Sequence, residues 1–119
     1  MLPFLEDRKK ITDELLDTFI KAGDLSLDLR EKGLIKEIKE DNTPVTNGDL
    51  EVNKILVNKI GELTPEIPII SEETSKNKDI KDLSNFWLID PIDGTFDYIN
   101  NREEFTLNAA LIINKIPTI

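Results

Sequence analysis

Two aspartates and a threonine stand close together in the sequence, directly after a short apolar run. The run Phe86 to Ile89 has the length and bulk of a buried strand. The polar residues that follow it within six positions are Asp90, Asp93 and Thr95. Pro91 cannot donate a backbone hydrogen bond, so we expect the chain to leave the sheet there, with Asp90 at the strand tip. Two carboxylates and a hydroxyl would then face one point.

An oxygen-rich cluster of this kind suits a hard divalent cation. Mg²⁺ takes carboxylates, carbonyls and water rather than nitrogen or sulfur. Gly94 permits a turn or close approach that a side chain would block, and Thr95 would then cap a short helix. The unpaired N–H groups at the start of such a helix suit phosphate. The alternative is that the segment DPIDGT is only a turn between a strand and a helix.

A second acidic pair follows another predicted strand. The segment Ile67 to Ile70 is short and apolar, and Glu72 and Glu73 come directly after it. If both predicted strands end at the same edge of a sheet, Glu72 lies near Asp90 and Asp93, and like charges so close need a cation between them. The alternative is that the two glutamates form a solvated loop.

Asp49, a further acidic residue, has a structural explanation of its own. Thr46 and Asp49 have the spacing of a helix capping box, in which a side chain at the third helical position bonds back to the N-cap residue. Asp49 therefore closes a helix cap whether or not it has a further role.

The remaining segments alternate between helix-type and strand-type hydrophobic patterns. A first amphipathic helix is expected from Pro3 to Glu31, with Gly33 as its stop, and a second follows Thr46 and ends at Gly61. The other expected elements are a strand or hairpin arm over Leu34 to Lys39, a turn over Asp41 to Pro44, a surface loop over Thr74 to Asn85, a strand over Thr106 to Ile113, a turn at Asn114 and Lys115, and the start of a partner strand over Ile116 to Ile119. The pattern predicts a layered α/β fold with amphipathic helices packed on a mixed sheet.

Composition excludes several classes of function. The chain has 119 residues and a formal net charge of −9, so broad contact with nucleic acid phosphates is not expected. It contains no cysteine and no histidine, which excludes thiolate chemistry, Ser-His-Asp catalysis and imidazole-bound zinc within this chain. No apolar run approaches the length of a membrane span, and we expect a cytoplasmic protein without an integral membrane segment.

The segment WLIDPIDGT, followed by DY, resembles the metal-binding signature of the inositol monophosphatase superfamily, the Mg²⁺-dependent and Li⁺-sensitive phosphomonoesterases. The segments DNTPVTNGD, ISEE, DGTFDY and EEFTLNAALI are similar to those of the 3′(2′),5′-bisphosphate nucleotidases of the CysQ type, which act in sulfur assimilation. In that branch an acidic residue precedes the aromatic one, as Asp97 precedes Tyr98 here. Phe96 and Glu103 depart from the branch, which more often has lysine and glycine at these positions.

The resemblance implies a role for each matching residue. Mg²⁺ would be bound by Glu72, Asp90, Asp93 and the carbonyl of Ile92. Asp49 and Thr95 would act together as catalytic residues that orient the attacking water. Gly94 and Thr95 would hold the substrate phosphate.

The resemblance also implies a substrate class and a missing part. It covers almost the whole chain but only the front of the family fold, without the later Trp-Asp segment that completes the metal site, so we expect an N-terminal fragment that is inactive or impaired. The expected substrate of the complete form is 3′-phosphoadenosine 5′-phosphate, which would be hydrolysed to AMP. The alternatives are an inositol monophosphatase acting on an inositol or sugar phosphate, and a non-catalytic remnant that serves as an interaction module. We also expect self-association through the unfinished C-terminal strand, and the resemblance allows a peripheral location at the inner membrane.

Overall fold

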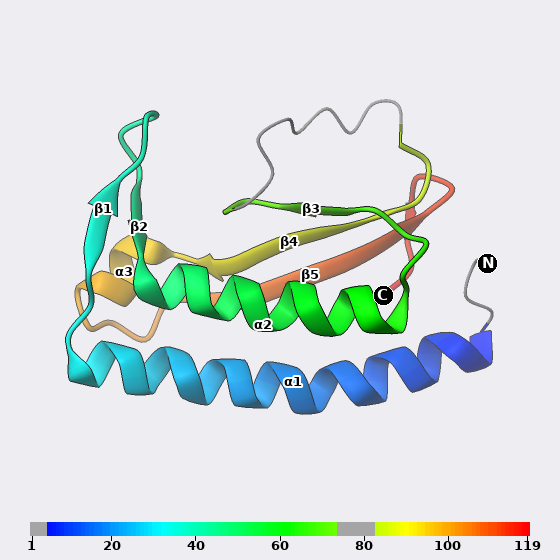
Figure 1. The fold of residues 1–119 in the computed structure, drawn as a ribbon, viewed down its shortest axis with the longest axis horizontal. Helices are drawn as coiled ribbons and strands as arrows, with labels where there is room; N and C mark the ends of the chain where they lie inside the picture. The colour runs from blue at the N-terminus through cyan, green and yellow to red at the C-terminus, as the bar shows by residue number, and fades with distance from the viewer. Residues whose placement is uncertain (1–4, 74–82) are drawn as a thin grey trace.

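Two long helices lie along one face of a mixed sheet, and a hairpin and a short helix close one end (Figure 1). The computed structural model describes residues 5–73 and 83–119. The expected α/β architecture, with amphipathic helices packed on a mixed sheet, is confirmed. The expected start of the first helix at Pro3 and most of the expected surface loop, residues 74–82, lie outside the described residues. No helix in the described part of the chain is long and apolar enough to cross a membrane.

The first helix, α1, spans Leu5–Lys32, and its apolar side chains recur at the spacing that one buried face requires. Ile11, Leu15 and Ala22 are all buried in the core. The helix ends directly before Gly33, whose φ of 102° is a left-handed conformation that glycine adopts without a Cβ clash. The predicted stop at this glycine is therefore confirmed.

The second helix, α2, spans Asn47–Leu63 and begins with the predicted capping box between Thr46 and Asp49. The prediction that Gly61 ends this helix is wrong. A glycine inside a helix costs only about 1 kcal/mol relative to alanine. That cost is offset because Leu63 packs on the core and the Thr64 hydroxyl donates to the Ile60 carbonyl at 2.9 Å, which satisfies the last turn.

The hairpin between the two helices consists of β1, Lys36–Ile38, and β2, Pro44–Thr46, paired antiparallel. The strand expected over Leu34 to Lys39 is thus present in shortened form. The prediction that Pro44 belongs to a turn is wrong, because Pro44 is the first residue of β2 and pairs with Ile38. The first position of a strand tolerates proline because its missing N–H removes no interior ladder bond.

The main sheet has the strand order β3-β4-β5-β6. Its first strand, β3, spans Ile69–Ser71 and runs parallel to β4, Phe86–Asp93. The antiparallel strands are β5, Thr106–Ile113, and β6, Ile116–Pro117, on either side of the predicted turn. Trp87 of β4 is fully buried, and its indole Nε1 donates to the Thr64 hydroxyl at 3.0 Å, which joins the sheet to the end of α2.

The prediction that the chain leaves the sheet at Pro91 is wrong. The ladder between β4 and β5 pairs Asp90 with Asn108, and its next pair is Asp93 with Thr106, so a bulge lies between them. Pro91 is placed in this bulge, where the N–H that it lacks is not needed for a ladder bond. Asp90 is therefore inside the strand, and Asp93 is at its end.

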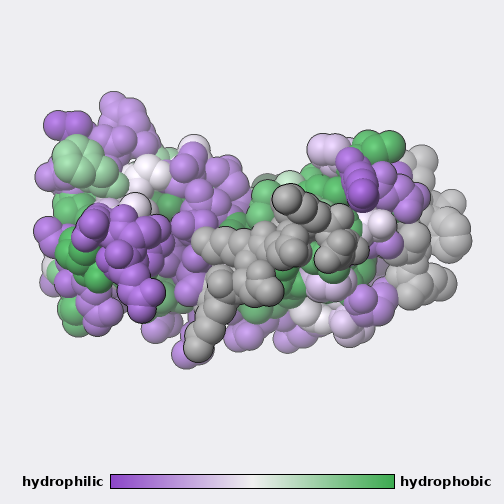
Figure 2. All heavy atoms as spheres, turned by 90° about the horizontal axis from the view of Figure 1, so that it is seen from above, coloured by the Kyte–Doolittle hydropathy of each residue, from purple (hydrophilic) through white to green (hydrophobic). Residues whose placement is uncertain are grey.

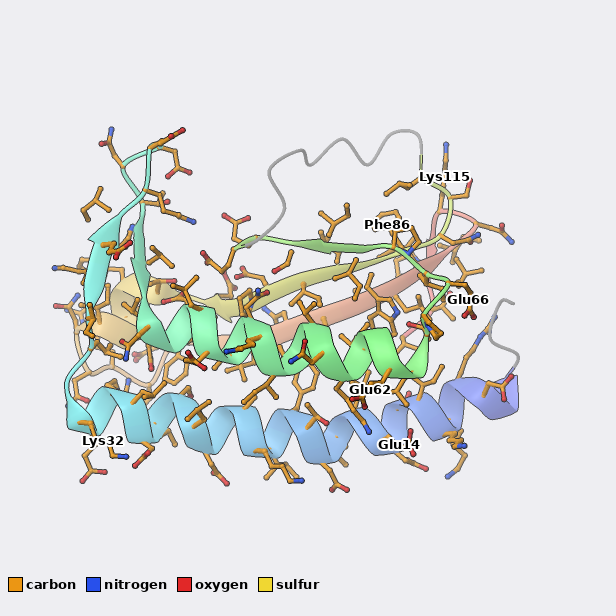
Figure 3. The ribbon with its side chains drawn as sticks, viewed as in Figure 1. Glu14, Lys32, Glu62, Glu66, Phe86 and Lys115 are labelled. Atoms are coloured by element: carbon orange, nitrogen blue, oxygen red, sulfur yellow. The ribbon has the colours of Figure 1, made fainter. Side chains whose placement is uncertain are left out.

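The face of the sheet opposite the helices carries apolar side chains. Phe86, Leu88, Ala110 and Ile112 contribute to a groove of about 480 Å³ there, and Leu88 is 44% exposed. Figure 3 shows Phe86 near the start of β4 and Lys115 at the β5–β6 turn, at the end of the molecule farthest from the hairpin. In the view from above, hydrophilic residues predominate at the hairpin end, and hydrophobic residues are visible around the grey segment toward the other end (Figure 2).

Candidate functional site

A cleft of about 290 Å³ lies between the hairpin and the end of β4. Its walls include every residue that the sequence assigned to metal or phosphate, while Asp49 lies behind them. The residues that line it are Lys39, Thr43, Pro44, Glu72, Glu73, Asp90, Ile92, Asp93, Gly94, Thr95 and Phe96. Segments that are far apart in the chain therefore meet at the point where the sequence placed its chemistry.

Gly94 forms the tight connection between β4 and the five-residue helix α3, Thr95–Ile99. Its φ is 90°, and a Cβ at this position would lie 2.7 Å from the carbonyl oxygen of Glu104. A side chain is thus excluded both by backbone conformation and by space. Because no side chain is present, the segment that contains Glu104 and Phe105 can pack directly against the backbone at this corner of the cleft.

Thr95 is the first residue of α3, and the prediction that it caps this helix is wrong, since the N-cap is Gly94 without a side-chain bond. The Thr95 hydroxyl oxygen lies 2.9 Å from Asp49 Oδ1 and 3.2 Å from the Ile92 carbonyl oxygen. Its single proton can be donated to either acceptor. The hydroxyl therefore belongs to a bridge between α3, β4 and α2 and does not satisfy a helix amide.

Asp49 is fully buried and uses its two carboxylate oxygens for different tasks. Oδ2 accepts from the backbone N–H of Thr46 at 2.9 Å and from its hydroxyl at 2.5 Å, while Oδ1 accepts from the Thr95 hydroxyl. The structure therefore shows the cap and, on the other oxygen, a contact with the predicted catalytic partner.

The acids of the cleft are surrounded by like charges. Burial raises the pKa of Asp90, and the neighbouring carboxylates of Asp93 and Glu72 raise it further. Burial likewise raises the pKa of Glu73, and the ammonium group of Lys39 opposes that shift. The cleft thus concentrates negative charge that the fold only partly compensates.

Two residues of the cleft were missed or undervalued by the sequence reasoning. The side chain of Glu73 is only 3% exposed, against 44% for Glu72, although the sequence favoured Glu72. The ammonium nitrogen of Lys39 lies 3.5 Å from Glu72 Oε1 and 3.8 Å from Glu73 Oε2. A lysine beside a polar turn gives no sequence signal for this role, because only the fold of the hairpin brings it to the glutamates.

The donor set suits a hard cation, but the acids are not gathered around one point. Carboxylates and the Ile92 carbonyl provide the oxygen donors that Mg²⁺ prefers. Within residues 5–73 and 83–119, however, no three acidic side chains are close enough together to hold one metal ion. Glu72, Asp90 and Asp93 therefore line the same cleft, but their carboxylates do not converge on one point as predicted.

Comparisons with known proteins agree with the fold and with the motifs. A model of the inositol monophosphatase family matches residues 7–119. The chain is 35% identical over 114 residues to the 3′(2′),5′-bisphosphate nucleotidase CysQ of Buchnera aphidicola subsp. Acyrthosiphon pisum. The aligned segment covers 93% of this chain and 43% of that protein. This chain spans less than half the length of that relative.

Solved structures of greater length contain the same fold. A staphylococcal inositol monophosphatase soaked with 100 mM LiCl gives a TM-score of 0.79 at 21% identity, over 99% of this chain and 44% of that one. An IMPase/NADP phosphatase complexed with Mg²⁺ and phosphate gives a TM-score of 0.73 at 25% identity, over 90% of this chain and 41% of that one.

Proposed function

The chain belongs to the inositol monophosphatase family, and from this premise we propose that its cleft is part of a Mg²⁺-dependent phosphomonoesterase site. The observation that carries the proposal is the cleft itself. Four carboxylates line it, and Gly94, which has no side chain, forms one corner. The hydrogen-bonded pair of Asp49 and Thr95 lies beside that corner.

In this proposal the metal ligands are Glu72, Asp90, Asp93 and the carbonyl of Ile92. When bound at such a site, Mg²⁺ lowers the pKa of a coordinated water and stabilises the charge of a leaving oxygen. The negative charge of the cleft and the raised pKa of Asp90 support the assignment, because carboxylates that repel one another gain from a shared cation.

Thr95 and Asp49 position the attacking water in this scheme. When the Thr95 hydroxyl donates its proton to Asp49 Oδ1, its lone pairs are free to accept a hydrogen bond from a water in the cleft. Asp49 is held in turn by Thr46, so the orientation of the hydroxyl is set by a buried carboxylate. Gly94 and Thr95, at the start of α3, hold the substrate phosphate in this proposal.

For the substrate we propose a nucleotide bisphosphate, with 3′-phosphoadenosine 5′-phosphate as the first candidate. The relative named CysQ supports this choice. Phe96 adds a structural reason, since its ring lines the cleft and is 64% exposed. The central carbon of the Arg102 guanidinium lies 5.8 Å from the centroid of that ring. Stacking of a base on an aromatic ring contributes about 1–3 kcal/mol, and an inositol phosphate offers no base to stack.

The complete activity is proposed for a form that includes the remaining part of the family domain, because this chain spans only 43% of the relative's length. The chain alone is expected to be slow. A non-catalytic interaction module is the competing proposal. The cytoplasmic location, the Li⁺ sensitivity, the role in sulfur assimilation and the self-association through the C-terminal strand stay predictions.

The decisive measurement is phosphate release from 3′-phosphoadenosine 5′-phosphate and from inositol 1-phosphate, with Mg²⁺, without it and with added Li⁺. We expect slow, Mg²⁺-dependent release that Asp93→Asn abolishes. Phe96→Ala should raise KM for the nucleotide several-fold and leave KM for inositol 1-phosphate unchanged. Release that persists in Asp93→Asn would locate the activity elsewhere, and no release with either substrate from a form that includes the remaining part of the family domain would favour the interaction module.

A further inference from the structure

Lys39 is the one basic side chain among the described residues that line the cleft, and no motif in the sequence predicts a role for it. Its side chain is only 27% exposed. The ammonium nitrogen stands between two glutamates of the segment after β3, at 3.5 Å from Glu72 and 3.8 Å from Glu73. A lysine on an ordinary solvated turn would extend into water and would not be placed among carboxylates.

The hairpin that carries Lys39 is fixed at both of its ends. At its tip the backbone N–H of Lys39 donates to the Thr43 carbonyl at 2.8 Å, and Asp41 accepts from the Thr43 N–H at 3.1 Å. At its base Ile35 and Asn47 bond to each other twice, at 2.9 and 3.0 Å. Because the backbone is held in this way, the hairpin fixes where the Lys39 side chain begins, and the two glutamates attract its ammonium group from there.

The charges explain what the lysine does there. Four carboxylates and one ammonium group give the cleft a formal charge of −3 when all are ionised. The distances from Lys39 to the glutamates exceed the 2.7–2.9 Å or so of a tight charge-assisted hydrogen bond. The lysine therefore compensates charge without being locked to either oxygen.

We propose that Lys39 is a positioning residue that acts as the internal counter-cation of the cleft. It holds Glu72 and Glu73 in place when no divalent cation is bound, and an incoming divalent cation competes with it for their oxygens. The inference rests on the proposed function only in taking the cleft as the cation site. It gives the hairpin a role in metal binding that is separate from the ligands themselves.

The test compares Lys39→Met, Lys39→Arg and Lys36→Met. Lys36→Met is the matched control, because Lys36 is exposed on the same arm of the hairpin, three residues before Lys39, and the change in charge is identical. Two quantities are measured for each protein: the melting temperature in EDTA, and the affinity for Mg²⁺ by calorimetry at low ionic strength.

We expect Lys39→Met to lower the metal-free melting temperature by about 4 °C, since the carboxylates lose their counter-charge. The same variant should bind Mg²⁺ roughly three- to tenfold more tightly, because a competing positive charge has been removed. Lys39→Arg should resemble the wild type in both measurements, and Lys36→Met should change each of them less than Lys39→Met does.

A lysine with only a structural role would not lower the metal-free melting temperature and at the same time raise the affinity for Mg²⁺ when it is replaced. If Lys39→Met binds Mg²⁺ no more tightly than Lys36→Met, the inference about Lys39 is overturned while the metal site stands. If neither the wild type nor Lys39→Met binds Mg²⁺ at all, both this inference and the metal part of the proposed function are overturned.

Discussion

The buried carboxylate of Asp49 and the carboxylates of the cleft lie close to one another but have opposite surroundings. Asp49 accepts hydrogen bonds from three donors of the protein, two on Thr46 and one on Thr95. Asp90 faces Asp93 and Glu72, and these neighbours together with burial raise its pKa. The first carboxylate is satisfied by the fold, whereas the second gains most from a cation supplied from outside.

This difference separates residues that stabilise the fold from residues that are available to a ligand. A carboxylate whose acceptor sites are filled by buried donors stabilises the folded state, and its removal leaves those donors unsatisfied. A carboxylate that is held against like charges costs stability until a cation compensates it. Substitutions in the two groups should therefore change the stability of the metal-free protein in opposite directions.

The largest effect is expected for Asp49→Ala, which removes the acceptor of three hydrogen bonds and the capping box of α2. Loss of a cap costs about 1 kcal/mol, and each buried donor left unpaired costs about 1–3 kcal/mol. We expect a loss of about 4 kcal/mol in the free energy of unfolding in urea, followed by the fluorescence of Trp87.

Asp49→Asn is the informative companion, because an amide keeps one acceptor oxygen and the size of the side chain. It should cost about half as much as Asp49→Ala. A metal-free protein that tolerates Asp49→Ala without loss of stability would remove the distinction between the two groups of carboxylates.

A smaller effect is expected from Tyr98 at alkaline pH. Tyr98 is fully buried and donates from its hydroxyl to the Ser26 carbonyl at 2.6 Å, and burial followed by the charge of Asp49 raises the pKa of Tyr98 to about 12. The folded state thus favours the neutral phenol. Its contribution to stability is complete below pH 10 and is lost as the pH rises from 10 to about 12, by roughly 2 kcal/mol.

The measurement is urea unfolding at several pH values between 9 and about 12, with Tyr98→Phe as control. The phenylalanine variant should begin less stable by about 1 kcal/mol, because it lacks the bond to Ser26, and should lose less stability over this range. Parallel curves for the two proteins would show that neither burial nor the charge of Asp49 raises the pKa of Tyr98.

The part of the site that could be predicted from the sequence is the part encoded by local chemistry. The cap between Thr46 and Asp49 depends on a spacing of three residues, and the need for glycine at position 94 follows from its turn. The end of β4 differs from the prediction because a bulge accommodates Pro91, and a bulge is defined by the pairing with the partner strand β5. The residues around the proline do not indicate how β5 will pair with β4.

The relations across the cleft could not be predicted for the same reason. The position of Lys39 beside Glu72 and Glu73 depends on how the hairpin is placed against β3, and no periodicity in the sequence records that placement. The burial of the Glu73 side chain similarly depends on neighbours from distant segments. The fold itself was predictable, because the helical and strand-type patterns are long and their core positions are regular.

The smallest effect, and the one that tests the comparison through its sign, is expected for Asp93→Asn. This change removes a like charge beside Asp90 and leaves an amide of the same size, so the metal-free protein should become more stable by about 0.5–1 kcal/mol. In Mg²⁺ the wild type should be the more stable protein, since the variant lacks a proposed ligand and gains less stability from the ion.

Asp97→Asn is the matched control. The carboxylate of Asp97 lies 3.4 Å from the Arg102 guanidinium, so the same chemical change there removes an attraction and should lower stability slightly. Urea unfolding in EDTA and in Mg²⁺ measures all three proteins, and a loss of stability for Asp93→Asn in EDTA would mean that the carboxylates of the cleft are already compensated by the fold.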